Sequence, residues 1–155
     1  MSPTPEAIYA TYTFDSEQPL PPFSDDVNLF FVKGQVGGTK KYPACGIVAR
    51  NERSETIGWA LGALEESNIF SGDHLWVDPG HRRSEPLLWR RLMTDLEAQL
   101  VRLECTTIKT HPFQFGGKGP GELKLIEMYK SIGYVPEDPD EEIPIYLIKH
   151  IVTGD

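Results

Sequence analysis

Apolar and polar positions alternate along several short stretches of this chain. Ile8–Phe14 alternates in this way and predicts a first strand. Cys45–Asn51, Thr56–Glu66 and Asp73–Asp78 are three further strand-like stretches, separated by the polar or small residues ERSE and SNIFSG. Short strands joined by such turns predict an antiparallel meander in the middle of the chain.

A leucine repeat follows the meander and predicts the longest helix. Ser84 is a suitable N-cap and Pro86 is tolerated in a first turn, so the helix is expected to begin there and to end near Arg102–Glu104. Its apolar face consists of leucines that recur every fourth residue, namely Leu88, Leu92, Leu96 and Leu100.

The remaining stretches carry weaker patterns. The Pro-rich segment 15–26 is typical of a connector, and Ser24 with two following aspartates favours a short helix over Val27–Lys33. Thr and Ile residues in Cys105–His111 predict a strand, and Leu123–Gly133 predicts a second long helix that stops at its glycine. A final strand is expected over Ile143–Ile151.

This order of strands and helices predicts an α+β fold in a single domain spanning residues 1–155. The strand–helix–strand unit from Asp73 to His111 should place its two strands parallel, in a right-handed crossover.

Composition narrows the function. The net charge of −8 and the pI near 5.0 argue against general nucleic-acid binding, which needs an excess of Lys and Arg. The chain has no apolar run of about 18 residues and begins without a secretion signal, so we expect a cytoplasmic protein with no membrane span. Cys45 and Cys105 are expected to be buried free thiols, and no Cys/His set has the spacing of a metal site.

The stretch from Leu75 to Met93 combines a strand, a tight turn and a helix start. Unpaired amides at a helix start favour an anion, and Arg82 and Arg83 add two positive charges beside them. The segment is a candidate cradle for a pyrophosphate, although two arginines could equally decorate a solvated turn.

Two motifs in this chain resemble landmarks of the GCN5-related N-acetyltransferase (GNAT) superfamily. Val77-Asp78-Pro79-Gly80-His81-Arg82 is similar to the first half of the family's V-x-P-x-x-R-x-x-G-x-G/A turn. Tyr129-Lys130-Ser131-Ile132-Gly133-Tyr134 is similar to its Y-x-x-x-G-F/Y helix end. The resemblance covers roughly Cys45 to Ile151 and implies an acyl-CoA N-acyltransferase-like fold, with a mixed central sheet splayed at its centre and flanking helices.

The resemblance also implies an activity. The expected reaction moves an acetyl group from acetyl-CoA to an amine acceptor, a small molecule or a protein, by direct attack. Tyr129 would be the general acid, and Asp73 or His74, before the turn, could be the base. The residues expected to hold acetyl-CoA are Val77, Arg82, Arg83, Ser84, Glu85, Leu87 and Leu88.

The chain departs from the family pattern in the turn. Glu85 and Leu87 stand where the family usually has small residues, and Pro86 removes one amide. Glu85 could point away and leave the cradle working, acetyl-CoA could bind loosely, or the site could be lost. The alternative function is a catalytically inactive scaffold that binds a protein or senses CoA, and a homodimer is compatible with either function.

Overall fold

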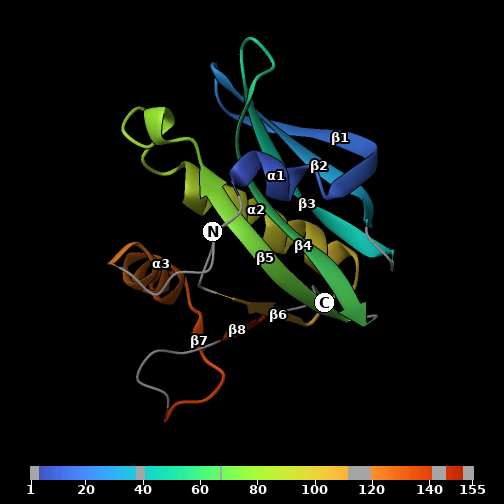
Figure 1. Cartoon of the computed structure of the whole chain (residues 1–155), viewed down its shortest axis with the longest axis vertical. Coiled ribbons are helices and arrows are strands. Elements are labelled where there is room, and N and C mark those ends of the chain that lie inside the picture. The colour runs from blue at the N-terminus through green and yellow to red at the C-terminus, as the bar shows by residue number, and fades with distance from the viewer. Residues whose placement is uncertain (1–3, 38–40, 67, 112–119, 141–145, 152–155) are drawn as a thin grey trace.

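The computed structural model describes residues 4–37, 41–66, 68–111, 120–140 and 146–151 (Figure 1). The helices are α1 (Pro5–Tyr9), the 3₁₀ helix η1 (Pro79–His81), α2 (Leu88–Arg102) and α3 (Pro120–Ser131). The strands are β1 (Tyr12–Ser24), β2 (Val27–Val36), β3 (Tyr42–Asn51), β4 (Thr56–Glu66), β5 (Ile69–Val77), β6 (Thr107–Thr110), β7 (Val135–Pro136) and β8 (Leu147–His150).

The described strands form one sheet of eight, in the order β1-β2-β3-β4-β5-β6-β8-β7. Only β5 and β6 are parallel, and the other neighbouring pairs are antiparallel. The α+β fold with a mixed sheet and flanking helices is therefore confirmed, and so is the parallel pair joined through α2. None of the helices in the described part of the chain is long and apolar enough to cross a membrane.

The prediction of a connector over residues 15–26 is wrong, because most of that segment belongs to β1. Pro19, Pro21 and Pro22 are tolerated there because β1 is an edge strand, where a residue without an N–H donor is accepted more easily than in a central strand. The expected first strand also begins later than Ile8. Pro5–Tyr9 forms α1 instead, with the Thr4 hydroxyl accepting the amide of Ala7 at 3.2 Å.

The helix expected over Val27–Lys33 is in fact the strand β2. Ser24 pairs with Val27, so Asp25 and Asp26 form the turn of a tight hairpin rather than a helix start. Alternate residues of β2 are buried on opposite faces of the sheet, and this burial on both faces hides the period of two. The predicted turn SNIFSG is also shorter than expected, since β5 already begins at Ile69.

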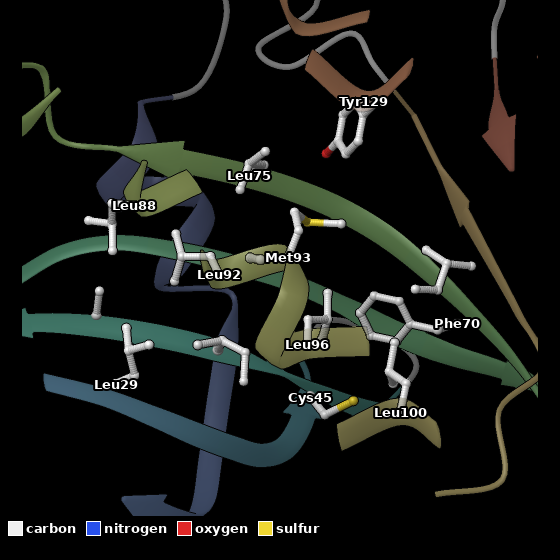
Figure 2. Packing of buried hydrophobic residues seen from close by; sticks show 14 of the residues in the cluster. Leu29, Cys45, Phe70, Leu75, Leu88, Leu92, Met93, Leu96, Leu100 and Tyr129 are labelled. Carbon is white, nitrogen blue, oxygen red and sulfur yellow. The ribbon is translucent and has the colours of Figure 1, made fainter. Parts of the chain in front are cut away.

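The main hydrophobic core lies between the sheet and α2. The predicted leucine stripe is buried there together with Met93, and it packs on residues of β2 to β5 such as Leu29, Cys45 and Leu75 (Figure 2). Both cysteines are buried free thiols, as expected. The stripe anchors α2 over the centre of the sheet, which positions the turn that precedes it.

A second cluster covers the opposite face of the sheet, under α1. Ile8 packs there with Val32, Val48 and Leu61, and the rings of Trp59 and Trp76 lie 4.4 Å apart between centroids. The central strands are thus buried on both faces, which explains their nearly continuous apolar sequence.

Helix α3 ends as its glycine predicts. The amides of Gly133 and Tyr134 donate back to the carbonyls of Lys130 and Tyr129, both at 3.1 Å, and Gly133 adopts φ +103°. Lys149 then binds the Ile132 carbonyl at 2.8 Å, which joins this helix end to β8. Most of the expected loop 112–122 and part of the expected last strand lie outside the described residues.

Replacement of Gly133 by alanine should lower the free energy of unfolding by about 1–2 kcal/mol, because the left-handed backbone conformation is strained for a residue with a Cβ. The added Cβ would also lie 3.2 Å from Cε of Lys149. Urea denaturation measures the loss. Gly37→Ala is the control, since its Cβ would meet nothing closer than 3.4 Å, and equal losses in both variants would contradict the prediction.

Candidate functional site

The sheet opens at its centre, between β5 and β6. These strands pair only from Ile69 to Gly72, and β5 then continues to Val77 while β6 ends at Thr110. The pairing of β5 with β4 shifts at the same place, because Leu61 lies opposite His74 whereas the next residue, Gly62, lies opposite Gly72. Asp73 is therefore an extra residue in β5, and such a bulge bends the strand away from its neighbour.

A small pocket lies at this opening, with room for about one water molecule. It brings together residues from β4, β5, β6, α2 and α3. Its lining consists of Ala60, Leu61, Phe70, Gly72, His74, Met93, Leu96, Ile108, Thr110 and Tyr129. Two of the predicted catalytic residues, His74 and Tyr129, thus meet in one pocket although they lie far apart in the sequence.

Tyr129 reaches this pocket from α3. Its ring is 3% exposed and its hydroxyl points toward β5 and the side of α2 that carries Met93 (Figure 2). The hydroxyl lies 3.3 Å from the Thr110 hydroxyl. Burial raises the pKa of Tyr129 to about 12, so the side chain is a neutral phenol that can donate a proton.

His74 is the candidate base that the structure places in the pocket. Burial lowers its pKa to about 4, because the apolar surroundings disfavour the imidazolium. The imidazole is therefore neutral at neutral pH and able to accept a proton, although weakly. The backbone of Asp73 forms the bulge of β5, and its side chain lies outside the described part of the structure.

The predicted N-cap at Ser84 is wrong, because α2 begins at Leu88 and its cap position is Leu87. The chain first winds into η1, where the Asp78 carboxylate accepts the Gly80 amide at 3.0 Å. Pro86 explains the delay, since a residue before proline avoids the helical conformation and proline offers no amide to a preceding turn. The Ser84 hydroxyl instead donates to the His81 carbonyl at 3.4 Å.

Turn bonds occupy part of the expected anion cradle. In the segment 79–88 the amides of Gly80, His81, Arg82, Glu85 and Leu88 already have acceptors within the turn. The amides of Arg83, Ser84 and Leu87 donate to no acceptor among the described residues. An anion could therefore be bound by these three amides, which are fewer than a helix start at Ser84 would have offered.

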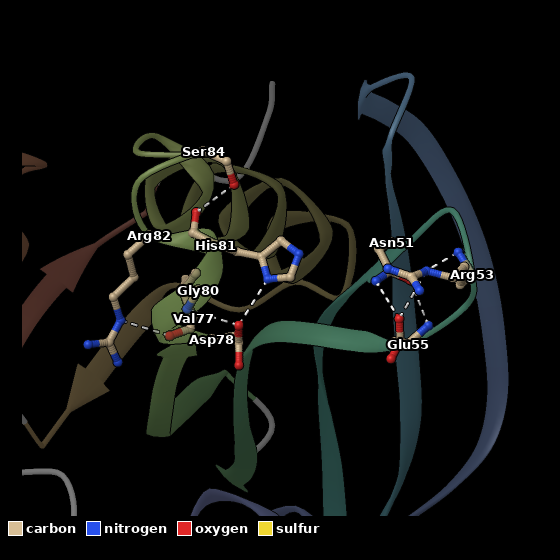
Figure 3. Close-up of polar contacts among 9 residues, drawn as sticks. All are labelled: Asn51, Arg53, Glu55, Val77, Asp78, Gly80, His81, Arg82 and Ser84. Carbon is tan, nitrogen blue, oxygen red and sulfur yellow. Dashed lines mark hydrogen bonds and ion pairs between the residues drawn. The ribbon is translucent and has the colours of Figure 1, made fainter.

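Arg82 folds back over the free edge of β5. Its Nε donates to the Val77 carbonyl at 2.8 Å, while His81 lies on the other side of the turn, 3.0 Å from the Asp78 carboxylate (Figure 3). Neither Arg82 nor Arg83 forms an ion pair with a described residue, and both are exposed. Two positive charges are thus available beside the opening of the sheet.

The Glu85 carboxylate does not lie on the amides of the turn. It accepts the hydroxyl of Ser24 at 3.4 Å, at the end of β1, and no amide of the segment 79–88 donates to it. Of the other residues predicted to hold acetyl-CoA, Leu87 is exposed, whereas the Leu88 side chain is buried in the core under α2. The Leu88 amide donates to the Glu85 carbonyl at 3.1 Å, so neither this amide nor the side chain is open to a ligand in this structure.

Thr110 and Gly72 are site residues that the sequence predictions missed. The Thr110 hydroxyl lies 3.2 Å from the Gly72 carbonyl and 3.3 Å from the Tyr129 hydroxyl. Alternation along Cys105–His111 places Thr110 on the same face as the buried Ile108, and a threonine on a buried face was the available signal. No group of residues suited to holding a metal ion occurs among those described.

Comparison with known proteins identifies this fold. No protein-family profile and no curated protein matches the chain. Among solved structures, Tetrahymena GCN5 is similar over 72% of this chain and 71% of its own, at 12% identity and a TM-score of 0.54.

Two bacterial structures are similar as well. An acetyltransferase from Bacillus cereus matches at 22% identity and a TM-score of 0.51, over 69% of this chain and 72% of its own. The GNAT family N-acetyltransferase YhbS from Escherichia coli, solved in complex with CoA, matches at 16% identity and a TM-score of 0.51, over 70% of this chain and 59% of its own. The chain therefore has the GNAT fold that its two motifs resemble.

The low pKa of His74 makes the stability of the protein depend on acidity. Between pH 6.5 and about 4 the unfolded chain binds a proton at this residue and the folded chain does not. The free energy of unfolding should therefore fall as the pH drops through this window, by up to about 1.4 kcal/mol per pH unit.

Urea denaturation across this window checks the prediction. His74→Gln should flatten the slope, and His150→Gln is the control because His150 is exposed at the end of β8. An unchanged slope in His74→Gln would rule out His74 as its source.

Proposed function

We propose that this protein is an N-acetyltransferase that moves the acetyl group of acetyl-CoA onto an amine by direct attack. The observation that carries the proposal is the meeting of a neutral phenol, Tyr129, and a neutral imidazole, His74, at the opening of a GNAT-type sheet. A proton donor and a proton acceptor in one pocket are the groups that acyl transfer between a thiol and an amine needs.

The turn before α2 is the proposed site for the pyrophosphate of acetyl-CoA. Arg82 and Arg83 supply two positive charges that form no ion pair with a described residue, and the amides of Arg83, Ser84 and Leu87 supply donors. Glu85 is turned toward Ser24, which leaves the amides of the turn free of its carboxylate. The CoA bound to YhbS is a further reason to expect this co-substrate.

The free edge of β5 would hold the pantetheine arm. Among the described residues, no strand pairs with β5 beyond Gly72 on the side of β6, so the backbone groups of this edge can bind an extended ligand. The Val77 carbonyl is at present bonded to Arg82. Release of Arg82 toward the pyrophosphate would free this carbonyl, so that one movement would serve both parts of the ligand.

The proposed reaction uses the two groups in the pocket. A cationic acceptor first releases a proton to solvent, because an ammonium nitrogen has no lone pair. The neutral amine nitrogen then attacks the thioester carbon, a C–N bond forms, and the C–S bond breaks with its electron pair passing to sulfur. Tyr129 gives its proton to that thiolate, and His74 receives the proton that the amine loses. Because the pKa of His74 is low, the imidazolium would then give its proton back to the Tyr129 phenolate, which restores both groups.

The acceptor is proposed to be a primary amine, on a small molecule or a protein. The net charge of −8 favours approach of a cationic substrate, and the segment before β8 carries exposed Glu137, Asp138 and Asp140. The same charge disfavours nucleic acid as a partner. We place the activity in the cytoplasm, where acetyl-CoA is available to an enzyme with free thiols.

Acetyl-CoA should bind with micromolar affinity, and Arg82→Ala should weaken that binding at least about tenfold, because a charged contact to phosphate is lost. Calorimetric titration measures both affinities. Arg102→Ala is the control, since it removes the same charge at the far end of α2. The absence of binding at acetyl-CoA concentrations up to millimolar would contradict the proposal. Binding without acetylation of any amine would favour a protein that senses CoA.

Tyr129→Phe should bind acetyl-CoA normally and lose on the order of 100-fold in kcat, because the thiolate then leaves without a proton donor. Tyr134→Phe is a matched control. The Tyr134 hydroxyl is also buried, it has no hydrogen-bond partner among the described residues, and its ring lies 5.2 Å from that of Tyr129. Equal activity of Tyr129→Phe and the wild type in an acetylation assay would exclude Tyr129 as the acid.

A further inference from the structure

We propose that Thr110 is a positioning residue for Tyr129. The hydroxyl hydrogen of Thr110 switches from the Gly72 carbonyl to the tyrosine oxygen when Tyr129 gives up its proton. This inference rests on the proposed function, because it concerns the acid step of that reaction. It assigns a role to a residue that lies outside both GNAT-like motifs.

The position of Thr110 allows only a few hydrogen-bond arrangements. The side chain is 2% exposed, so bulk solvent does not reach its hydroxyl, and the adjoining pocket has room for about one water molecule. Its oxygen lies 3.2 Å from the Gly72 carbonyl and 3.3 Å from the Tyr129 hydroxyl, and it carries a single hydrogen. The carbonyl can only accept. When Thr110 donates to Gly72, its oxygen is free to accept the phenol proton of Tyr129.

The second arrangement suits the state after proton transfer. Once the Tyr129 proton has passed to the departing thiolate, the tyrosine is an anion in a largely apolar pocket, which is costly without a donor. Rotation of the Thr110 hydroxyl would supply that donor without moving any heavy atom. The bond would favour the anion, and hydrogen bonds to charged groups are the stronger ones.

The Gly72 carbonyl can release Thr110 at little cost. It also accepts the backbone amide of His111 at 3.3 Å, so it keeps one partner when the threonine hydrogen turns away. Both groups lie at the last step of the β5–β6 ladder. The switch is therefore built into the place where the sheet opens, and β6 ends at the residue that carries it.

Few other titratable groups of the described residues act on Tyr129. From β5, His74 is the titratable side chain of the described pocket lining, and it is neutral at neutral pH. From the α3 end, Tyr134 packs on the ring as a neutral phenol. Burial raises the pKa of Tyr134, and the negative charge of Glu97 in α2 raises it further. Glu97 is itself paired with Lys149 of β8 at 2.7 Å. Thr110 is the neighbour whose hydroxyl bonds Tyr129 directly.

Two substitutions separate the hydroxyl from the shape of the side chain. Thr110→Val removes the hydroxyl and keeps the branched shape, whereas Thr110→Ser keeps the hydroxyl. We expect Thr110→Val to lower kcat on the order of 10- to 100-fold with KM for acetyl-CoA unchanged, and Thr110→Ser to retain most of the activity. Urea denaturation of each variant establishes that it is folded at the assay temperature.

Two further measurements distinguish the switch from a merely structural role. In the Tyr129→Phe background, Thr110→Val should not lower kcat further, because the phenol hydroxyl that Thr110 would stabilise is absent. In protein containing fluorotyrosine, the ¹⁹F resonance of Tyr129, assigned by its loss in Tyr129→Phe, should titrate at higher pH in Thr110→Val than in the wild type.

The results can overturn the inference in separate ways. Wild-type activity in Thr110→Val, an equal loss in both tyrosine backgrounds, or an unchanged titration of Tyr129 would each contradict it. If the folded wild type transfers no acetyl group, the proposed function fails, and with it the catalytic role of Thr110. The titration would then still decide whether Thr110 stabilises the anion of Tyr129.

Discussion

The structure depends on where backbone pairing between β5 and β6 stops. Four residues of each strand are paired, and the bulge at Asp73 then carries β5 away while β6 ends at Thr110. A strand edge left unpaired inside a sheet exposes amides and carbonyls that must find other partners. Here the Arg82 side chain, the Thr110 hydroxyl and the His111 amide bind carbonyls along this edge. The same edge is the natural place for an extended ligand.

Hydrophobic packing holds this opening in a defined shape. The leucine stripe of α2 is buried against strands β2 to β5. Tyr129 and Ile126 of α3 belong to the same hydrophobic cluster. Lys149 connects α2, α3 and β8 through Glu97 and the Ile132 carbonyl. The two helices are therefore joined to the sheet and to each other, which keeps Tyr129 in the lining of the pocket.

The turn before α2 shows how one proline alters a binding site. Pro86 delays the helix, and the preceding residues satisfy several of their own amides in turns. The loss of donors is offset by two arginines without ion pairs among the described residues, and by the diversion of Glu85 to Ser24. A cradle of this kind relies more on side-chain charge and less on backbone amides than one built from glycines.

The sequence by itself determined the elements whose signals are local: the meander, the leucine stripe of α2, the glycine stop of α3 and the parallel pair of strands joined through α2. It also indicated Tyr129, because a motif of fixed spacing carries it. It did not determine β1, because its prolines are compatible with a strand only at the edge of a sheet, and the sequence does not show which strand is at the edge. It did not determine β2, because burial on both faces hides the alternation of its residues. Only the tertiary structure decided that His74, Thr110 and Tyr129 share one pocket, because their meeting depends on a bulge and on long-range pairing that no local pattern records.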